Sequence, residues 1–71
     1  MKLILEVFGK SQSQNGEIVE RIIHSEIVES KESALTRKEE LLKTHEDFKD
    51  ATFYLHYCRH DEGKPCTREK I

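Results

Sequence analysis

The apolar residues of this chain fall in blocks, and polar stretches separate the blocks. Residues 2–9 and 51–60 place an apolar side chain at every second position, which is the two-residue period of a β-strand. The residues that share one face are Leu3, Leu5 and Val7 in the first block and Phe53, Leu55 and Tyr57 in the second. The opposite faces are only partly apolar. The pattern therefore predicts two strands, each with one well-buried face.

The block at residues 17–28, EIVERIIHSEIV, fits two interpretations. Its apolar positions match a helical stripe, but every apolar side chain in it is Ile or Val. Such β-branched side chains favour strands, and the Asn15-Gly16 pair before the block favours a hairpin. We predict a strand, with a helix as the alternative. The apolar positions change face part-way along, which predicts a β-bulge or burial on both faces.

Residues 31–47 carry the clearest helical pattern. Ser30 is suited to be the N-cap, and neither proline nor glycine interrupts the segment. Apolar residues recur on a narrow stripe at Ala34, Leu35, Leu41, Leu42 and Phe48. We therefore predict one helix here, with a face that packs against the strands.

This order of elements predicts an α+β fold over a single domain, residues 1–71. We expect a small antiparallel or mixed sheet of three to four strands with one helix packed on it, in the order β-β-α-β. Residues 64–71 form either a tail or a short fourth strand, and Pro65 confines such a strand to the sheet edge. The predicted core includes Leu3, Leu5, Val7, Ile23, Leu35, Leu42, Phe53 and Leu55.

Composition and charge exclude several classes of protein. The formal net charge is −2, so no net field attracts the chain to nucleic acid or anionic lipid. No apolar run is long enough to span a membrane. Glu6 interrupts the first apolar run too early for a signal peptide. We therefore expect a cytoplasmic protein with no membrane association, in which the two cysteines are free thiols or metal ligands.

The densest chemistry lies in residues 56–66, HYCRHDEGKPC. The spacing His56-x-Cys58-x-His60-x5-Cys66 combines two residue types that bind zinc. If residues 56–60 are one extended strand, the two histidines lie about 13 Å apart and one ion cannot hold both. We therefore predict no tightly bound metal and no cofactor. The remaining candidates are Cys58 and Cys66 with one of the two histidines, plus a fourth ligand from elsewhere.

The loop between the cysteines decides whether they are neighbours. A three-residue loop, residues 61–63, with Gly63 in the left-handed conformation places Cys58 opposite Cys66. A two-residue loop places Cys66 opposite Arg59 instead, and the thiols then lie on opposite faces. Adjacent cysteines need not be bonded, because we expect a reducing compartment. Two reduced cysteines near a hairpin end are the simplest expectation.

No motif assigns an activity or a family to the chain. The glycines are too far apart for a phosphate-binding loop, and HExxH does not occur. Cys58 and a histidine could form a nucleophile and its base, but a chain this short leaves little room for a water-excluded pocket. We therefore expect a protein that is not an enzyme.

The expected function is a non-catalytic protein-interaction module with an unknown protein partner. Its size is typical of accessory or inhibitor proteins of the phage or prophage type. The alternatives are a small structural zinc protein that uses Cys58, Cys66 and a histidine, and a single-stranded nucleic-acid-binding module. The residues of the nucleic-acid alternative are Tyr54, His56, Arg59, Lys64 and Arg68. Residues 17–28 could also form an unpaired edge that joins two copies in a homodimer.

Overall fold

The computed structural model describes all 71 residues and contains one α-helix and four strands. The elements, in chain order, are β1 (Lys2–Gln12), β2 (Ile18–Val28), α1 (Lys31–Thr44), the 3-10 turn η1 (Glu46–Phe48), β3 (Thr52–Cys58), the 3-10 turn η2 (His60–Glu62) and β4 (Thr67–Lys70). The predicted α+β class is confirmed. The ambiguous block at 17–28 is a strand, and the C-terminal segment contains the short fourth strand.

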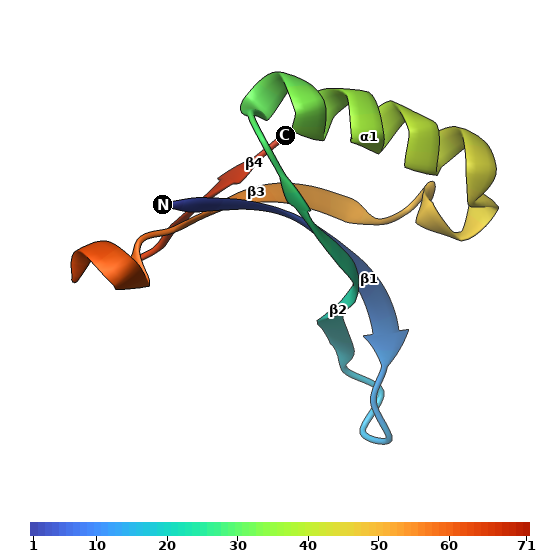
Figure 1. Ribbon diagram of the computed structural model, residues 1–71. Helices are drawn as coiled ribbons and strands as arrows, with labels where there is room; N and C mark the ends of the chain where they lie inside the picture. The colour runs from blue at the N-terminus through green and yellow to red at the C-terminus, as the bar shows by residue number, and fades with distance from the viewer.

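All strand pairs are antiparallel, and the sheet order is β2-β1-β3-β4. The first strand is therefore central, while β2 and β4 are the two edges. Figure 1 shows α1 lying across one face of the sheet, and the far half of the β1–β2 hairpin bends away from it. We refer to the face that α1 does not cover as the open face.

A β-bulge on β2 explains why its apolar positions change face. His24 pairs with Val7 and Ile22 pairs with Phe8, so Ile23 has no partner on β1. The extra residue shifts the alternation, which places Ile22 and Ile27 on the same open face. Gly9 makes room for the bulge, because a Cβ atom at this position would lie 2.9 Å from Cγ2 of Ile23. The predicted bulge is confirmed.

The core lies between α1 and the covered face of the sheet. Leu5, Val7 and Leu55 are fully buried at its centre. The other buried apolar residues are Val28, Ala34, Leu41, Phe48 and Phe53, and Leu3 and Leu42 pack against them while partly buried. Ser30 caps the helix, since its Oγ accepts a hydrogen bond from the Ser33 N–H at 3.1 Å. The helix ends at Thr44, before the predicted residue 47, and a 3-10 turn follows it.

Two residues of the predicted core are not in it. Ile23 is 48% exposed because it sits in the bulge, on the part of the hairpin that bends away from the helix. Leu35 is 41% exposed because it follows Ala34, and Ala34 already occupies the core-facing position of that turn. Both side chains lie beside the core, and neither forms part of it.

Because Leu55 is fully buried and Leu35 is exposed, the same Leu→Ala change at the two positions compares a core site with a surface site. Leu55→Ala should lower the free energy of unfolding by about 2–5 kcal/mol, because it leaves a cavity in the core. Leu35→Ala should lower it by less than about 1 kcal/mol, since that side chain already contacts solvent. Urea denaturation followed by circular dichroism measures both. Equal losses for the two variants would contradict the core described above.

Candidate functional site

The predicted strand at 51–60 ends earlier than expected, and this brings the candidate ligands together. Extended structure stops at Cys58. Arg59 has φ −120° and ψ 23°, and His60 begins the single turn η2. Gly63 then takes the left-handed conformation at φ 68°, as predicted, and directs the chain toward β4. The expectation that His56 and His60 lie on one extended strand is therefore wrong, and the separation of about 13 Å does not apply.

His60 lies against both cysteine sulfurs. Its Nδ1 is 3.1 Å from Sγ of Cys58 and 3.4 Å from Sγ of Cys66. The register of the last strand pair explains the approach, since Tyr57 pairs with Thr67 and the next position outward sets Cys66 opposite Cys58. Both cysteines are free thiols and are partly buried. The cysteines are neighbours, as the three-residue alternative predicted, but that loop is not formed: the connection runs from Arg59 to Cys66 and contains η2.

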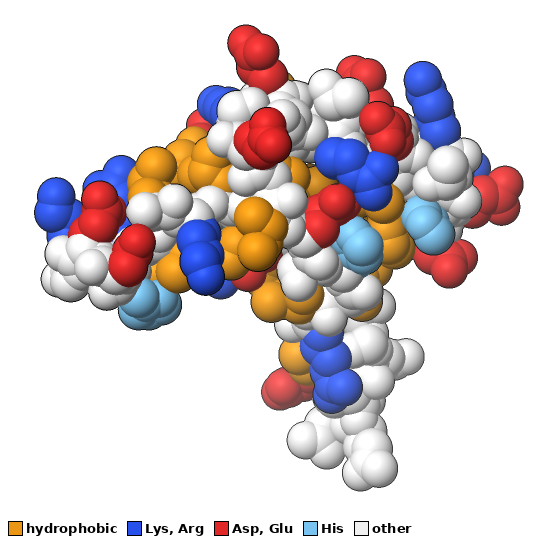
Figure 2. Space-filling view, in the orientation of Figure 1, with side chains coloured by type: hydrophobic (Ala, Val, Ile, Leu, Met, Phe, Trp, Pro, Cys, Tyr) orange, Lys and Arg blue, Asp and Glu red, His pale blue; other side chains and the backbone are white.

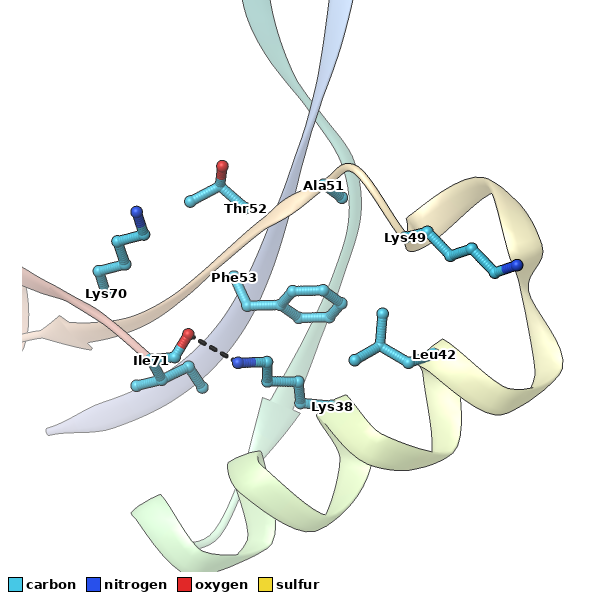
Figure 3. A pocket seen from close by; sticks show the side chains of 8 residues that line it. All are labelled: Lys38, Leu42, Lys49, Ala51, Thr52, Phe53, Lys70 and Ile71. Atoms are coloured by element: carbon cyan, nitrogen blue, oxygen red, sulfur yellow. Dashed lines mark hydrogen bonds between the residues drawn. The ribbon is translucent and has the colours of Figure 1, made fainter.

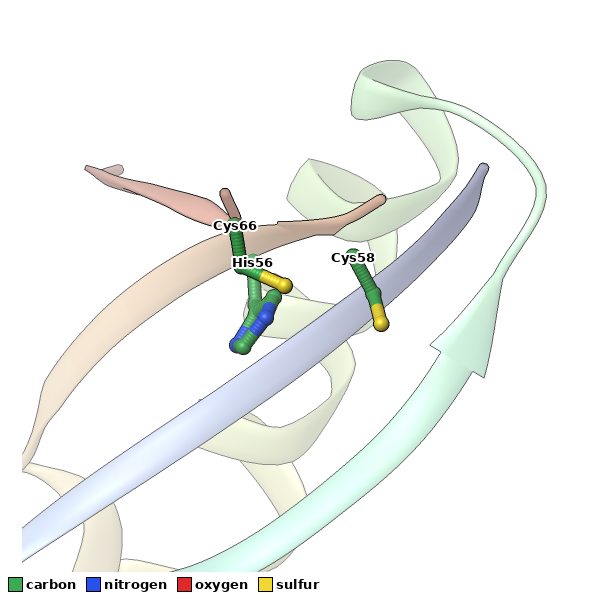
Figure 4. A group of neighbouring side chains, drawn as sticks. All are labelled: His56, Cys58 and Cys66. Atoms are coloured by element: carbon green, nitrogen blue, oxygen red, sulfur yellow. The ribbon is translucent and has the colours of Figure 1, made fainter. Parts of the chain in front are cut away.

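His56 reaches the same pair of sulfurs from β3. Potential ligand atoms of His56, Cys58 and Cys66 all lie within 4.8 Å of one another. Figure 4 shows the three side chains gathered beside the central strand. The structure therefore gathers His56, Cys58 and Cys66 into one group, and His60 lies against the two sulfurs without belonging to that group. We refer to these four residues as the Cys–His cluster.

A buried carboxylate orients His56. Glu6 is 6% exposed although it lies on the open face of the central strand. Its Oε1 is 3.3 Å from Nδ1 of His56 and accepts a hydrogen bond from Nε of Arg68 at 2.9 Å. The second ring nitrogen of His56, Nε2, is buried and has no hydrogen-bond partner. A buried polar atom without a partner is costly, and this region has two such atoms: Nε2 of His56 and Nε of Arg59.

The environment of Cys58 favours its thiolate. The backbone N–H and the side chain of His60 both stabilise the charged sulfur, and they lower the pKa of the Cys58 thiol below its ordinary value. The thiolate is both the nucleophilic form of cysteine and the metal-binding form. The position of His60 therefore favours the form of Cys58 that both chemistries use.

The residues of the nucleic-acid alternative are only partly available for that purpose. Arg68 is bonded to Glu6, and its guanidinium lies 5.3 Å from the ring centre of Phe8. Tyr54 packs edge-on against Phe8, with 5.2 Å between the ring centres. The Glu6 carboxylate thus lies among the basic and aromatic side chains of the open face. A nucleic-acid phosphate would need positive charge at this place, so the carboxylate disfavours binding.

The cavity of the molecule lies elsewhere, between the C-terminal part of α1 and the start of β3. It has a volume of about 340 Å³ and includes Phe53, Leu42 and three lysines in its lining. Lys38 donates a hydrogen bond to the backbone oxygen of Ile71 at 2.9 Å. Figure 3 shows Lys49 and Lys70 at opposite ends of the cavity, so the lysines do not converge on one point.

The exposed apolar surface is concentrated on β2. Five of the seven large apolar side chains that are exposed belong to this edge strand: Ile18, Val19, Ile22, Ile23 and Ile27. Figure 2 shows hydrophobic side chains at the surface near the base of the β1–β2 hairpin, while the tip of the hairpin is polar. We refer to these five residues as the β2 apolar edge.

No protein-family model, no curated protein and no solved structure matches this chain. The single α-helix is too short and too polar to cross a lipid bilayer.

Sequence reasoning missed Glu6 as part of the site. Its signal was present, because Glu6 is the one charged residue within the apolar run from Leu3 to Phe8. A lone carboxylate in a central strand must find partners, since an unpaired buried charge is strongly unfavourable. What the sequence could not supply was the register that sets Glu6 beside His56 and Arg68.

The lowered pKa of Cys58 predicts unequal thiol reactivity. In metal-free protein near neutral pH, iodoacetamide should alkylate Cys58 faster than Cys66, because His60 lowers the pKa of the Cys58 thiol. His60→Ala should reduce the difference, and urea should abolish it by removing the folded environment. Peptide mass spectrometry at timed intervals reads both sites. Equal rates in the folded protein would contradict the described environment of Cys58.

Proposed function

We propose that this chain is a non-catalytic protein-interaction module, and that its contact surface is the β2 apolar edge. The observation that carries the proposal is the concentration of exposed Ile and Val side chains on a single edge strand. Ile18 and Ile27 are 72% and 71% exposed. Isolated surface apolar residues are common in proteins, but three of these side chains, Ile18, Ile22 and Ile27, share the open face of one strand, and such grouping is typical of an interaction site.

The backbone of β2 supports the same proposal. This strand has 11 residues and pairs with β1 alone, so the N–H and C=O groups of its outer side have no strand partner. An unpaired edge with apolar side chains can accept a strand from another chain. The bulge at Ile23 interrupts the edge and leaves a regular segment on either side of it. Strand addition would thus use one of these two shorter segments.

The charges on the edge are compatible with such pairing. Glu26 is bonded to Nε of Arg37 at 3.1 Å, so its charge is compensated within the molecule. Glu20 and Arg21 are adjacent and of opposite sign. The edge therefore has little net charge, and two copies of it would not repel each other strongly. A second copy of the chain is accordingly the first partner to test.

The chemistry elsewhere in the molecule supports a non-catalytic role. The cavity is distant from the Cys–His cluster, and its lysines do not converge. Cys58 and His60 could act as nucleophile and base, but they lie at a hairpin end, where Cys58 is only partly buried and His60 is exposed. A reaction there would lack the water-excluded, concave surroundings that enzymes use to orient a substrate.

Sedimentation velocity tests self-association through β2. The chain should form a dimer as its concentration rises toward about 0.5 mM, which corresponds to roughly −4 to −5 kcal/mol of binding free energy. Ile27→Lys should abolish the dimer, because it places a charge in the apolar contact. Leu35→Lys is the matched control, since it changes an exposed apolar residue on the helix and should leave the dimer intact.

Two results would contradict this form of the proposal. One is a single species near 8.4 kDa at every concentration. The other is a dimer that is weakened by Leu35→Lys and unaffected by Ile27→Lys, which would place the contact on the helix.

A further inference from the structure

We propose that the Cys–His cluster binds one zinc(II) ion, with Cys58, Cys66, His56 and His60 as its four ligands. The proposal goes beyond the interaction module, because it concerns the opposite edge of the sheet and does not depend on a protein partner. It also replaces the expectation from sequence that no metal is tightly bound, since that expectation relied on an extended chain from 56 to 60.

The distances around His60 fit tetrahedral zinc. Zinc lies about 2.3 Å from sulfur and about 2.0–2.1 Å from nitrogen, so tetrahedral angles place a sulfur and a nitrogen ligand about 3.6 Å apart. Nδ1 of His60 is 3.1 Å from Sγ of Cys58 and 3.4 Å from Sγ of Cys66. Sγ of Cys66 is also 3.6 Å from Nε2 of His60, so this ring must turn for a single nitrogen to face an ion between the two sulfurs.

His56 supplies the second, independent observation. Its Nε2 is buried without a hydrogen-bond partner, while its Nδ1 faces the buried Glu6 carboxylate at 3.3 Å. A metal-binding histidine is usually held this way, with one ring nitrogen on a carboxylate and the other left free for the ion. Potential ligand atoms of His56 and of the two cysteines already lie within 4.8 Å of one another. Zinc would satisfy the one buried ring nitrogen that has no hydrogen-bond partner.

The donor set indicates which ion is bound. Two thiolates and two imidazoles suit a borderline-soft cation and exclude magnesium and calcium, which prefer oxygen ligands. As the sulfurs bind the ion, the two thiols release their protons to solvent, and no oxidation takes place. Four protein ligands leave no open coordination position, so the proposed ion is structural.

The ion would stabilise the weakest edge of the sheet. The β4 strand has only four residues and pairs with β3 alone. The Glu69 carboxylate joins it to the helix by accepting a hydrogen bond from Lys31 and to β3 by accepting one from Tyr57, each at 2.7 Å. An ion shared by the end of β3, the turn η2 and the start of β4 would close this hairpin. A small chain gains stability from such a metal site.

Zinc titration of the reduced chain tests the proposal. Native mass spectrometry should show one zinc per chain, and competition with a chromophoric chelator should give a Kd below about 50 nM, the weak end of structural zinc sites. Cobalt(II) in place of zinc should produce the absorption of a tetrahedral ion with thiolate ligands. The reductant keeps both cysteines available throughout.

Substitutions identify the ligands. Cys58→Ser and Cys66→Ser should each weaken binding by at least about 100-fold, and His56→Ala and His60→Ala by at least about tenfold. Glu6→Gln should weaken it by about 10–100-fold, because it removes the carboxylate that orients His56. His45→Ala is the matched control, since this exposed histidine lies at the end of the helix and should leave the Kd unchanged. Circular dichroism checks that each variant is folded.

The proposal is overturned if the folded, reduced chain binds zinc with a Kd above about 50 nM. It is also overturned if either cysteine variant binds zinc as tightly as His45→Ala. Failure of zinc binding would leave the dimer test of β2 unaffected, so the two proposals are tested independently.

Discussion

The structure depends on one constraint: a single helix must stabilise a sheet of four strands. One helix can cover one face of a sheet, so the apolar side chains of the central strands must lie on that face. Leu5, Val7 and Leu55 satisfy the requirement and are fully buried beneath α1. Even so, just nine of 71 residues are buried. The open face and both edges must therefore be stabilised by other means.

The open face and the two edge strands are each stabilised in a different way. On the open face, the buried Glu6 carboxylate joins three strands, because it contacts His56 on β3 and Arg68 on β4 while belonging to β1. At one edge, β2 keeps an exposed apolar strand that a second chain could cover. At the other edge, the short β4 strand begins beside two cysteines and two histidines. The zinc and partner proposals thus follow from the same shortage of buried surface, which is expected for a domain of this size.

The sequence was sufficient for the architecture because periodicity is a strong local signal. Alternation predicted β1 and β3, and β-branched residues correctly favoured a strand for β2. The change of face within residues 17–28 predicted a bulge or burial on both faces, and the structure has a bulge at Ile23. The errors arose where the outcome depends on long-range geometry. The bend of the hairpin removes Ile23 from the core. The turn at Arg59 brings His60 back to the cysteines, and alternation from Phe53 to His60 gave no sign of that turn. The partnership of Glu6 with His56 needed the register of β1 with β3.

The central claim is that the part of the sheet under α1 is stable by itself, whereas the edge strands β2 and β4 need a bound partner or ion. Residue-resolved hydrogen exchange, measured with and without zinc, tests this claim most directly. The account predicts the slowest amide exchange in β1 and β3 around Leu5 and Leu55, and faster exchange in β4 and in β2 beyond the bulge. Zinc should slow the exchange of the β4 amides by at least about tenfold and leave those of β2 unchanged. Protection of β4 equal to that of β3 in the metal-free chain would contradict the account, because the edge would then need no further support.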